Sequence, residues 1–227
     1  MIGNTCAPSP VATEEVCPQT AKRAVPALCR IAIGAPNSLA DVGVVPEMFG
    51  LLSDEFDLKL VSEHARPVRS NQQVSAFPDI EFNQDMFFDI LLVPGGAGTR
   101  REVNNKSLID WLASTSSRSK HVLSVCTGSA LLAKAGLLDG RAATTNKAAF
   151  SWVCEQGPNV NWVREARWVE DDKFVTSSGV SAGIDMALGV ISLLHGLETA
   201  LKVATWSEYD WHRDKNWDPF AKVHGLV

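Results

Sequence analysis

One cysteine stands where a predicted strand meets a predicted helix. In HVLSVCTGSALLAKAGLLDG, residues 121–140, an apolar run ends at Cys126, and Thr-Gly-Ser then begins a helical pattern. A tight strand-to-helix turn exposes such a side chain at the top of a sheet, as in the nucleophile elbows of hydrolases. The N–H groups and dipole of the helix lower the pKa of a thiol at that position and favour the nucleophilic thiolate. Cys126 is therefore a candidate nucleophile, and the alternative is a buried, inert cysteine.

Two further segments could supply groups that act with this thiol. The PGGAG loop at 94–98 offers backbone N–H groups, at Gly96 and Ala97, that can bind an anion or stabilise developing charge. The loop lacks the Gly-Lys-Ser/Thr ending of a phosphate loop, and a Gly-Gly pair is also common in ordinary turns. Asp41 follows the first predicted strand and could exchange a proton with the thiol, or it could be a helix N-cap. Glu47 could face the same cleft or solvent.

The composition limits the classes of function. The chain has 227 residues, which suits one domain, and its net charge of −5 without a basic run argues against a nucleic-acid partner. Its apolar stretches fall short of the roughly 20 residues that a membrane span needs. The five cysteines are odd in number and include no Cys-x-x-Cys pair, so neither a disulfide framework nor a thiolate zinc site is expected. The N-terminal residues do not resemble a secretory signal, and we expect a cytoplasmic protein with reduced thiols.

Strands and helices alternate along the chain, which favours a mostly parallel sheet covered by helices on both faces. We expect a flexible extension over residues 1–27 and a single domain over 28–227. The predicted strands cover 28–36, 56–62, the start of 88–100, 121–125 and 141–145, with short strands and loop over 63–88 and a hairpin over 164–179. The predicted helices cover 39–54, weakened by Gly43 and interrupted at Pro46, then 104–119, 128–140, 147–156, 181–196 and 197–214. Loops after three strands carry Asp41, the Gly-Gly pair and Cys126, and one sheet edge can bring them together.

Two residues of the fifth predicted helix, one polar and one acidic, have a simpler interpretation. In SAGIDMALG, Ser181 is a candidate N-cap and Asp185 is expected in the first turn, where a carboxylate favours the helix dipole.

Four stretches together resemble one known family. They are DILLVPGGAGTR, VLSVCTGSALLAKAGLLDGRAATTN, TSSGVSAGIDMALGVI and WSEYDWHRDKNWDPF. This combination, over about residues 29–221, resembles the ThiJ/PfpI superfamily, with its class I glutamine-amidotransferase-like fold, and in particular its isonitrile hydratase branch. The resemblance implies an α/β flavodoxin-like three-layer sandwich, a homodimer and a nucleophilic elbow cysteine at Cys126. It also implies that the acidic partner of that branch falls on Asp41 and its second-site hydroxyl on Thr127.

The chain departs from that pattern at two places. GVVPEM follows Asp41 where the branch usually has Gly-Pro, so the cleft entrance is expected to differ. Many members have a histidine after Ala-Thr-Thr, whereas this chain has Asn146, which cannot act as a base near neutral pH but can form hydrogen bonds. We therefore assign Asn146, with Gly96, Ala97 and Thr127, to substrate and oxyanion binding. Of the five histidines, only His212 could approach a cleft, and its aromatic neighbours favour a structural role.

These residues support three functional hypotheses. The first is a hydratase or related lyase that adds the Cys126 thiolate to a small electrophile, such as an isonitrile, with Asp41 as general acid/base and with neither a metal nor an organic cofactor. The second is a glyoxalase-like enzyme, or one that modifies a larger metabolite in a Trp-rich pocket. The third is a redox or ligand sensor. Regulators with this fold usually have a helix-turn-helix extension, and the end of the chain at Val227 is expected to leave no room for one.

Overall fold

The architecture is described from a computed structural model. It places residues 29–33, 39–70, 73–82 and 86–227, and for 29–33 and 39–42 we describe the backbone alone. The flexible extension expected at residues 1–27 lies outside the described residues.

A seven-stranded sheet in the order β10-β11-β7-β6-β1-β2-β5 forms the centre of the molecule. Its strands are β1 (Cys29–Ile33), β2 (Phe56–Ser62), β5 (Ile80–Glu81), β6 (Ile90–Val93), β7 (His121–Ser124), β10 (Trp168–Asp171) and β11 (Phe174–Ser177). All neighbours pair in parallel except β10 and β11, which form the predicted antiparallel hairpin. The order β2-β1-β6-β7-β11 matches the 2-1-3-4-5 order of flavodoxin, which confirms the predicted fold class.

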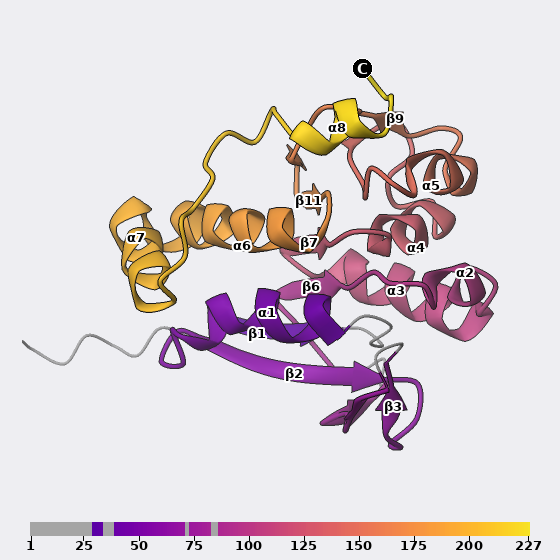
Figure 1. Cartoon of the computed structure of the whole chain (residues 1–227). Helices are drawn as coiled ribbons and strands as arrows, with labels where there is room; N and C mark the ends of the chain where they lie inside the picture. Colours follow the sequence, from indigo (N-terminus) through magenta and orange to yellow (C-terminus); the bar gives the residue numbers. More distant parts are fainter. Residues whose placement is uncertain (1–28, 34–38, 71–72, 83–85) are drawn as a thin grey trace, which may run out of the picture.

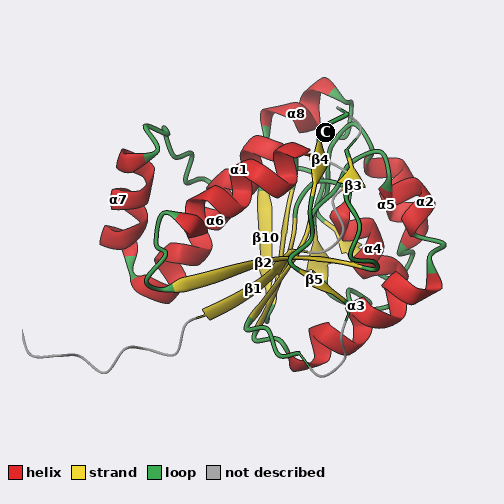
Figure 2. Cartoon of the chain, turned by 90° about the horizontal axis from the view of Figure 1, so that it is seen from below, coloured by secondary structure: helices red, strands yellow, loops and turns green. Residues whose placement is uncertain are grey.

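Helices cover both faces of this sheet (Figures 1 and 2). On one face lie α1 (Leu39–Gly50), α6 (Val180–His195) and α7 (Leu197–Trp206), and on the other lie α2 (Thr99–Glu102), α3 (Lys106–Arg118), α4 (Gly128–Lys134) and α5 (Phe150–Gln156). A short helix, α8 (Pro219–Val223), follows near the C-terminus. Two small sheets complete the described elements, β3 (Val68–Arg69) with β4 (Ser75–Ala76), and β8 (Ala142–Ala143) with β9 (Asn161–Trp162).

The central strand β6 shows why the two faces need separate layers of helices. Its sequence ILLV is buried at all four positions. Ile90 and Leu92 belong to the core under α1 and α6, and Leu91 and Val93 belong to the core under α3 and α4. Successive side chains of a strand point to opposite faces, so a continuous apolar run requires cover on both sides.

Three predicted helices have different ends in the structure. Helix α1 continues through Pro46 to Gly50, so the expected interruption is wrong; its residues Val45 and Phe49 are fully buried in the core shared with α6. Helix α4 ends at Lys134 rather than near 140, because Gly136 has a left-handed φ of 71°. Helix α7 ends at Trp206 rather than 214, with Glu208 at a φ of 49° just beyond it.

The N-terminus of α6 corrects two expectations. The N-cap of α6 is Gly179, and Ser181 lies inside the first turn, so Ser181 is not the cap. Asp185 is the sixth residue of α6 and is completely buried, so it does not have the expected dipole role. Its partner is Arg167. Asp185 Oδ2 lies 2.6 Å from Arg167 Nε and 2.5 Å from Arg167 Nη2.

Candidate functional site

Cys126 occupies a strained backbone position between β7 and α4. Its φ is 56°, in the left-handed region that a residue with a side chain rarely adopts. The residue is half-buried, whereas Val125 and Thr127 on either side of it are buried. The strand, the left-handed residue and the helix together form the elbow that the sequence predicted around this thiol.

Hydrogen bonds hold the Cys126 backbone on both sides. Its N–H donates to the carbonyl oxygen of Ser178 at 2.7 Å. Its own carbonyl oxygen accepts from Ser129 Oγ at 3.2 Å and from Thr145 Oγ1 at 3.0 Å. A left-handed residue persists only where its surroundings hold it in place, and here three chain segments do so.

The strain at Cys126 predicts an unusual order of stabilities. Cys126→Gly should be more stable than Cys126→Ala by about 1 kcal/mol, because a left-handed conformation is costly only for a residue with a Cβ. Urea unfolding of the two variants measures the difference. Ser117, an exposed residue inside α3, provides the control. Ser117→Ala should be more stable than Ser117→Gly by about 1 kcal/mol, a stability difference of the opposite sign. Equal stabilities of the two Cys126 variants would contradict the strain.

The loop after β6 packs directly against the elbow. A Cβ at Gly95 would lie 2.6 Å from the nitrogen of Thr127 and 2.8 Å from the Cβ of Cys126. A Cβ at Gly128 would overlap the carbonyl oxygen of Val93. The glycines therefore allow a close approach of two backbone segments, and the Pro-Gly-Gly loop and the elbow form one unit.

Thr127 joins the two loops through its hydroxyl. Gly96 N–H donates to Thr127 Oγ1 at 2.9 Å, and Thr99 Oγ1 lies 3.0 Å from the same oxygen. The Gly96 N–H is thus already used inside the site. Within the described part of the chain, the N–H groups of Ala97 and Thr127 have no acceptor, which leaves them available to an anion. Thr127 therefore holds the two loops together, and the donor role expected for it stays a prediction.

Asp41 lies in the first turn of α1, and only its backbone is described. Val45 lies one helical turn after Asp41. The side chains of Val45 and Val125 both approach Gly183 of α6, since a Cβ at Gly183 would lie 3.0 Å from Val45 and 2.7 Å from Val125. The N-terminal part of α1 thus runs past the elbow. Glu47 is exposed.

A cavity of about 510 Å³ begins beside the elbow. Ser178, whose carbonyl oxygen accepts the Cys126 N–H, is part of its wall. Asn146 also lines it and accepts the Ala149 N–H at 3.1 Å, so its amide oxygen closes a turn and its amide nitrogen remains for other contacts. The other lining residues are Val44, Lys147, Ala148, Gly179, Val180, Ser181, Ile184, Phe220 and His224. Only Asn146 of the predicted binding residues lies in this wall.

Lys147 is the cavity residue that the sequence did not reveal. It is only 3% exposed, and Nζ donates to Thr144 Oγ1 at 2.7 Å and to the Ala166 carbonyl oxygen at 2.6 Å. Burial lowers the pKa of this amine to about 8, against an opposing attraction from Asp218. A lysine beside Ala-Ala-Phe suggests a polar helix position, and only the tertiary structure shows its burial.

Other candidates lie apart from this cavity. His212 has the structural role expected for it, since its N–H donates to Asp185 Oδ1 at 2.9 Å and its ring lies 5.8 Å from that of Trp217. Cys154 on α5 is half-buried, and burial raises the pKa of its thiol. Among the described residues, no cluster of three His, Cys, Asp or Glu side chains has the geometry to hold a metal ion.

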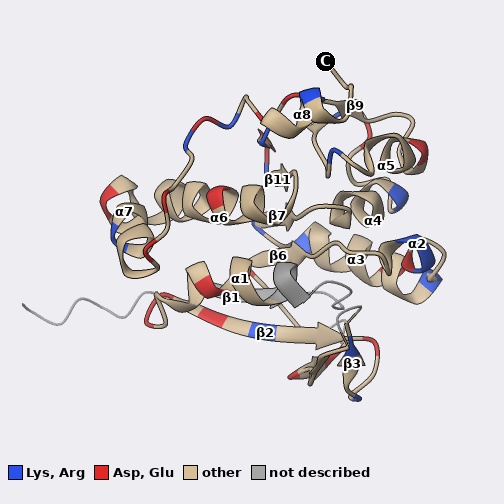
Figure 3. Cartoon of the chain, viewed as in Figure 1, with Lys and Arg blue, Asp and Glu red and all other residues tan. Residues whose placement is uncertain are grey.

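Charged residues of both signs are spread over the part of the chain that the structure describes. Figure 3 shows Lys and Arg interspersed with Asp and Glu over the helices and loops. None of the described helices combines the length and the apolar character that a membrane crossing requires.

Several known proteins are similar to this chain. A family model for the DJ-1/PfpI family matches residues 29–193. Isonitrile hydratase of Pseudomonas putida is 33% identical over 156 residues, which cover 68% of this chain and 67% of that protein. The HTH-type transcriptional regulator CdhR of Pseudomonas aeruginosa is 30% identical over 152 residues, but these cover only 45% of the regulator.

A solved structure extends the likeness to most of the chain. The THiJ/PfpI family protein from Pseudomonas syringae superposes with a TM-score of 0.73 at 27% identity, over 92% of this chain and 91% of the other. The match to the family model includes β1, the Pro-Gly-Gly loop, the elbow and most of α6. The chain therefore belongs to the DJ-1/PfpI family.

Proposed function

We propose that the chain is a cysteine-dependent enzyme that hydrates an isonitrile to an N-formamide through a covalent adduct on Cys126. The observation that carries the proposal is the strained elbow itself, with Cys126 at a φ of 56° beside a cavity of about 510 Å³. Strained residues persist only where the surrounding structure maintains them, and they cluster at functional sites, where the strain contributes to the mechanism. The 33% identity to an isonitrile hydratase supports this choice of substrate.

The proposed reaction has two steps. The Cys126 thiolate adds to the terminal carbon of the isonitrile, and that carbon takes up one proton, which gives a thioimidate. Water then adds to the same carbon, the C–S bond breaks, the thiolate leaves and the nitrogen is protonated, which gives the N-formamide. The sum is one isonitrile and one water for one formamide. Asp41 supplies and recovers the protons, and no histidine is needed, in keeping with Asn146.

The N–H groups of Ala97 and Thr127 are the proposed donors to the charge that develops when water adds. The Gly96 N–H binds Thr127 Oγ1 at 2.9 Å and so holds that donor set in place. Fixed backbone donors are effective because they need no reorganisation during the reaction.

The proposal predicts that the protein forms N-cyclohexylformamide from cyclohexyl isocyanide, and mass spectrometry measures this product. We expect wild-type turnover to exceed that of Cys126→Ala by at least about a hundredfold. Asp41→Asn should lose about a hundredfold. Cys154→Ala is the matched control, since Cys154 is a half-buried thiol away from the cavity, and it should retain wild-type activity.

Equal turnover by wild type and Cys126→Ala would reject the hydratase. If the protein forms no formamide but forms lactate from methylglyoxal without added glutathione, the glyoxalase-like alternative is supported.

A second candidate is a ligand sensor, because the relatives include transcriptional regulators such as CdhR and GbdR. The chain spans 45% and 42% of these two proteins, so the similarity concerns a part of each. A sensor would bind a small molecule, or react once per Cys126, without turnover. Stoichiometric modification of Cys126 by dilute peroxide, with no product from either electrophile, would favour this function.

A further inference from the structure

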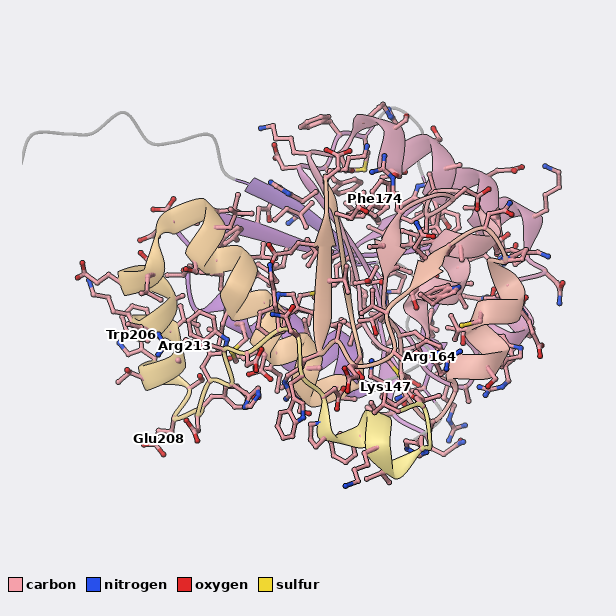
Figure 4. The ribbon with its side chains drawn as sticks, turned by 90° about the horizontal axis from the view of Figure 1, so that it is seen from above. Lys147, Arg164, Phe174, Trp206, Glu208 and Arg213 are labelled. Carbon is pink, nitrogen blue, oxygen red and sulfur yellow. The ribbon has the colours of Figure 1, made fainter. Side chains whose placement is uncertain are left out.

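Lys147 places a buried cation in the wall of the cavity. Lys147 lies close to α8 in Figure 4, and α8 contributes Phe220 to the same cavity, with His224 just after the helix. The rest of the lining is largely apolar, with Val44 from α1 and Val180 and Ile184 from α6. An apolar cavity with one cationic group selects for a ligand with two distinct parts.

The hydrogen bonds of Lys147 are incomplete. A protonated amine has three N–H donors, and Thr144 Oγ1 and the Ala166 carbonyl oxygen accept two of them, at 2.7 and 2.6 Å. Among the described residues no third oxygen accepts a hydrogen bond from Nζ, which also lies 5.9 Å from the centroid of the Phe150 ring. Because Lys147 is 3% exposed and lines the cavity, the third donor is left for a molecule inside it.

Among the residues that the structure describes, no carboxylate forms an ion pair with Lys147. Asp218, which is 3% exposed, attracts the amine, but its Oδ1 accepts the Phe220 N–H at 3.0 Å and caps α8. Desolvation outweighs this attraction and leaves the pKa of Lys147 lowered, at about 8. A protonated Lys147 at neutral pH therefore destabilises the empty fold, and an anionic ligand would remove that cost.

We propose that this cavity binds a small carboxylate with an apolar body, and that Lys147 Nζ donates to the carboxylate. The apolar part would lie against Val44, Ile184 and Phe220. The proposal names the substrate class of the hydratase, an isonitrile with a carboxylate at its other end, and in that respect it rests on the proposed function. Lys147 is a binding residue in this proposal and takes no part in bond formation.

Binding without turnover separates this proposal from the hydratase. Calorimetry compares 4-phenylbutanoate with 4-phenylbutanamide, a neutral ligand of nearly the same shape. At pH 7 the carboxylate should bind about tenfold more tightly than the amide, because a hydrogen bond between charged groups is the stronger one. The preference should vanish by pH 9.5, since the pKa of Lys147 is about 8 and the amine loses its proton over that range. The amide should bind equally at both pH values.

Several charged residues adjoin, in sequence, the groups that contact Lys147, and their effects must be separated from that of the lysine. They are Arg164, Glu165 and Arg167 beside Ala166, and Asp218, Lys222 and His224 on and around α8. The His224→Gln variant removes the other titratable group of the cavity wall and should keep the same pH dependence. Lys147→Met should lose the preference at pH 7, and Lys222→Met, an exposed lysine of α8, should keep it.

The outcomes divide clearly. The proposal is overturned if the carboxylate preference persists at pH 9.5 or if Lys147→Met retains it. It is also overturned if the two probes bind equally or if neither binds. If Lys147→Met does not fold, the pH series on wild type and His224→Gln decides alone. A carboxylate preference in a protein that forms no formamide would overturn the hydratase and leave the carboxylate site in place.

Discussion

Gly128→Ala is expected to lower the free energy of unfolding by about 3 kcal/mol or more, the largest effect of any single methyl group at the elbow. The added Cβ would overlap the carbonyl oxygen of Val93 and lie 3.0 Å from the carbonyl carbon and oxygen of Pro94. Both neighbours are backbone atoms at the end of the central strand, and neither can rotate away. The elbow and the Pro-Gly-Gly loop would have to separate, so activity should fall with stability. Urea unfolding and circular dichroism measure the effect.

The same substitution at Gly43 provides a control of opposite sign. Gly43 lies in α1 and is exposed, and outside its own helix turn no atom of the described residues lies within 4 Å of the position of an added Cβ. Gly43→Ala should therefore raise the free energy of unfolding by about 0.5–1 kcal/mol, the ordinary difference in helix propensity. A Gly128→Ala protein as stable as wild type would show that the two backbone segments can move apart at little cost.

The elbow could be predicted because its signals are local. An apolar run, one cysteine and a helical pattern follow one another within 121–134, and β7 and α4 form where that pattern places them. The alternation of strands and helices likewise predicted the parallel sheet and its two layers. Local patterns also located the hairpin of β10 and β11. Each of these features depends on neighbours a few residues apart.

The features that were missed depend on residues far apart in sequence. Lys147 is buried because the 163–166 loop and α8 cover it, and neither can be inferred from the residues around it. Asp185 seemed to lie near a helix start, but its partner Arg167 lies just before β10, 18 residues earlier in the chain. The end of α7 at Trp206 also depends on distant residues, because the segment after the helix forms long-range hydrogen bonds. The carbonyl oxygen of Lys215 accepts the N–H groups of Arg167 and Trp168 at 2.8 and 3.3 Å.

The largest electrostatic effect should come from Arg167→Met, which leaves the Asp185 carboxylate buried without its cation. Such a change costs about 3–5 kcal/mol, because the remaining charge has lost its compensation. Asp185 is completely buried, and desolvation raises its pKa despite the hydrogen bond and charge of Arg167. As a control, Lys202→Met breaks the exposed pair of Lys202 with Glu198, 3.1 Å apart, and should change stability by less than about 1 kcal/mol.

The pH dependence tests the cause of the loss. A carboxyl group whose pKa is raised in the folded state gains stability as pH falls, since the folded state then binds a proton more readily than the unfolded state. Removal of Arg167 raises the pKa of Asp185 further, so the deficit of Arg167→Met should shrink from pH 7 to pH 5, and Arg167→Met/Asp185→Leu should recover most of it at both values. A deficit independent of pH, and retained by the double variant, would mean that packing of the arginine rather than charge is responsible.

Loss of the Arg167–Asp185 pair should also weaken ligand binding in the cavity, because Asp185 holds the C-terminal segment that leads to α8. Asp185 binds that segment twice, since Oδ1 accepts the His212 N–H at 2.9 Å and the main-chain oxygen accepts Trp211 Nε1 at 3.1 Å. The same segment continues to α8, which brings Phe220 and His224 to the cavity. In Arg167→Met the His212 amide should therefore exchange its hydrogen faster, and binding of 4-phenylbutanoate should weaken. Fast exchange with unchanged binding would show that α8 holds its place over the cavity without the buried ion pair.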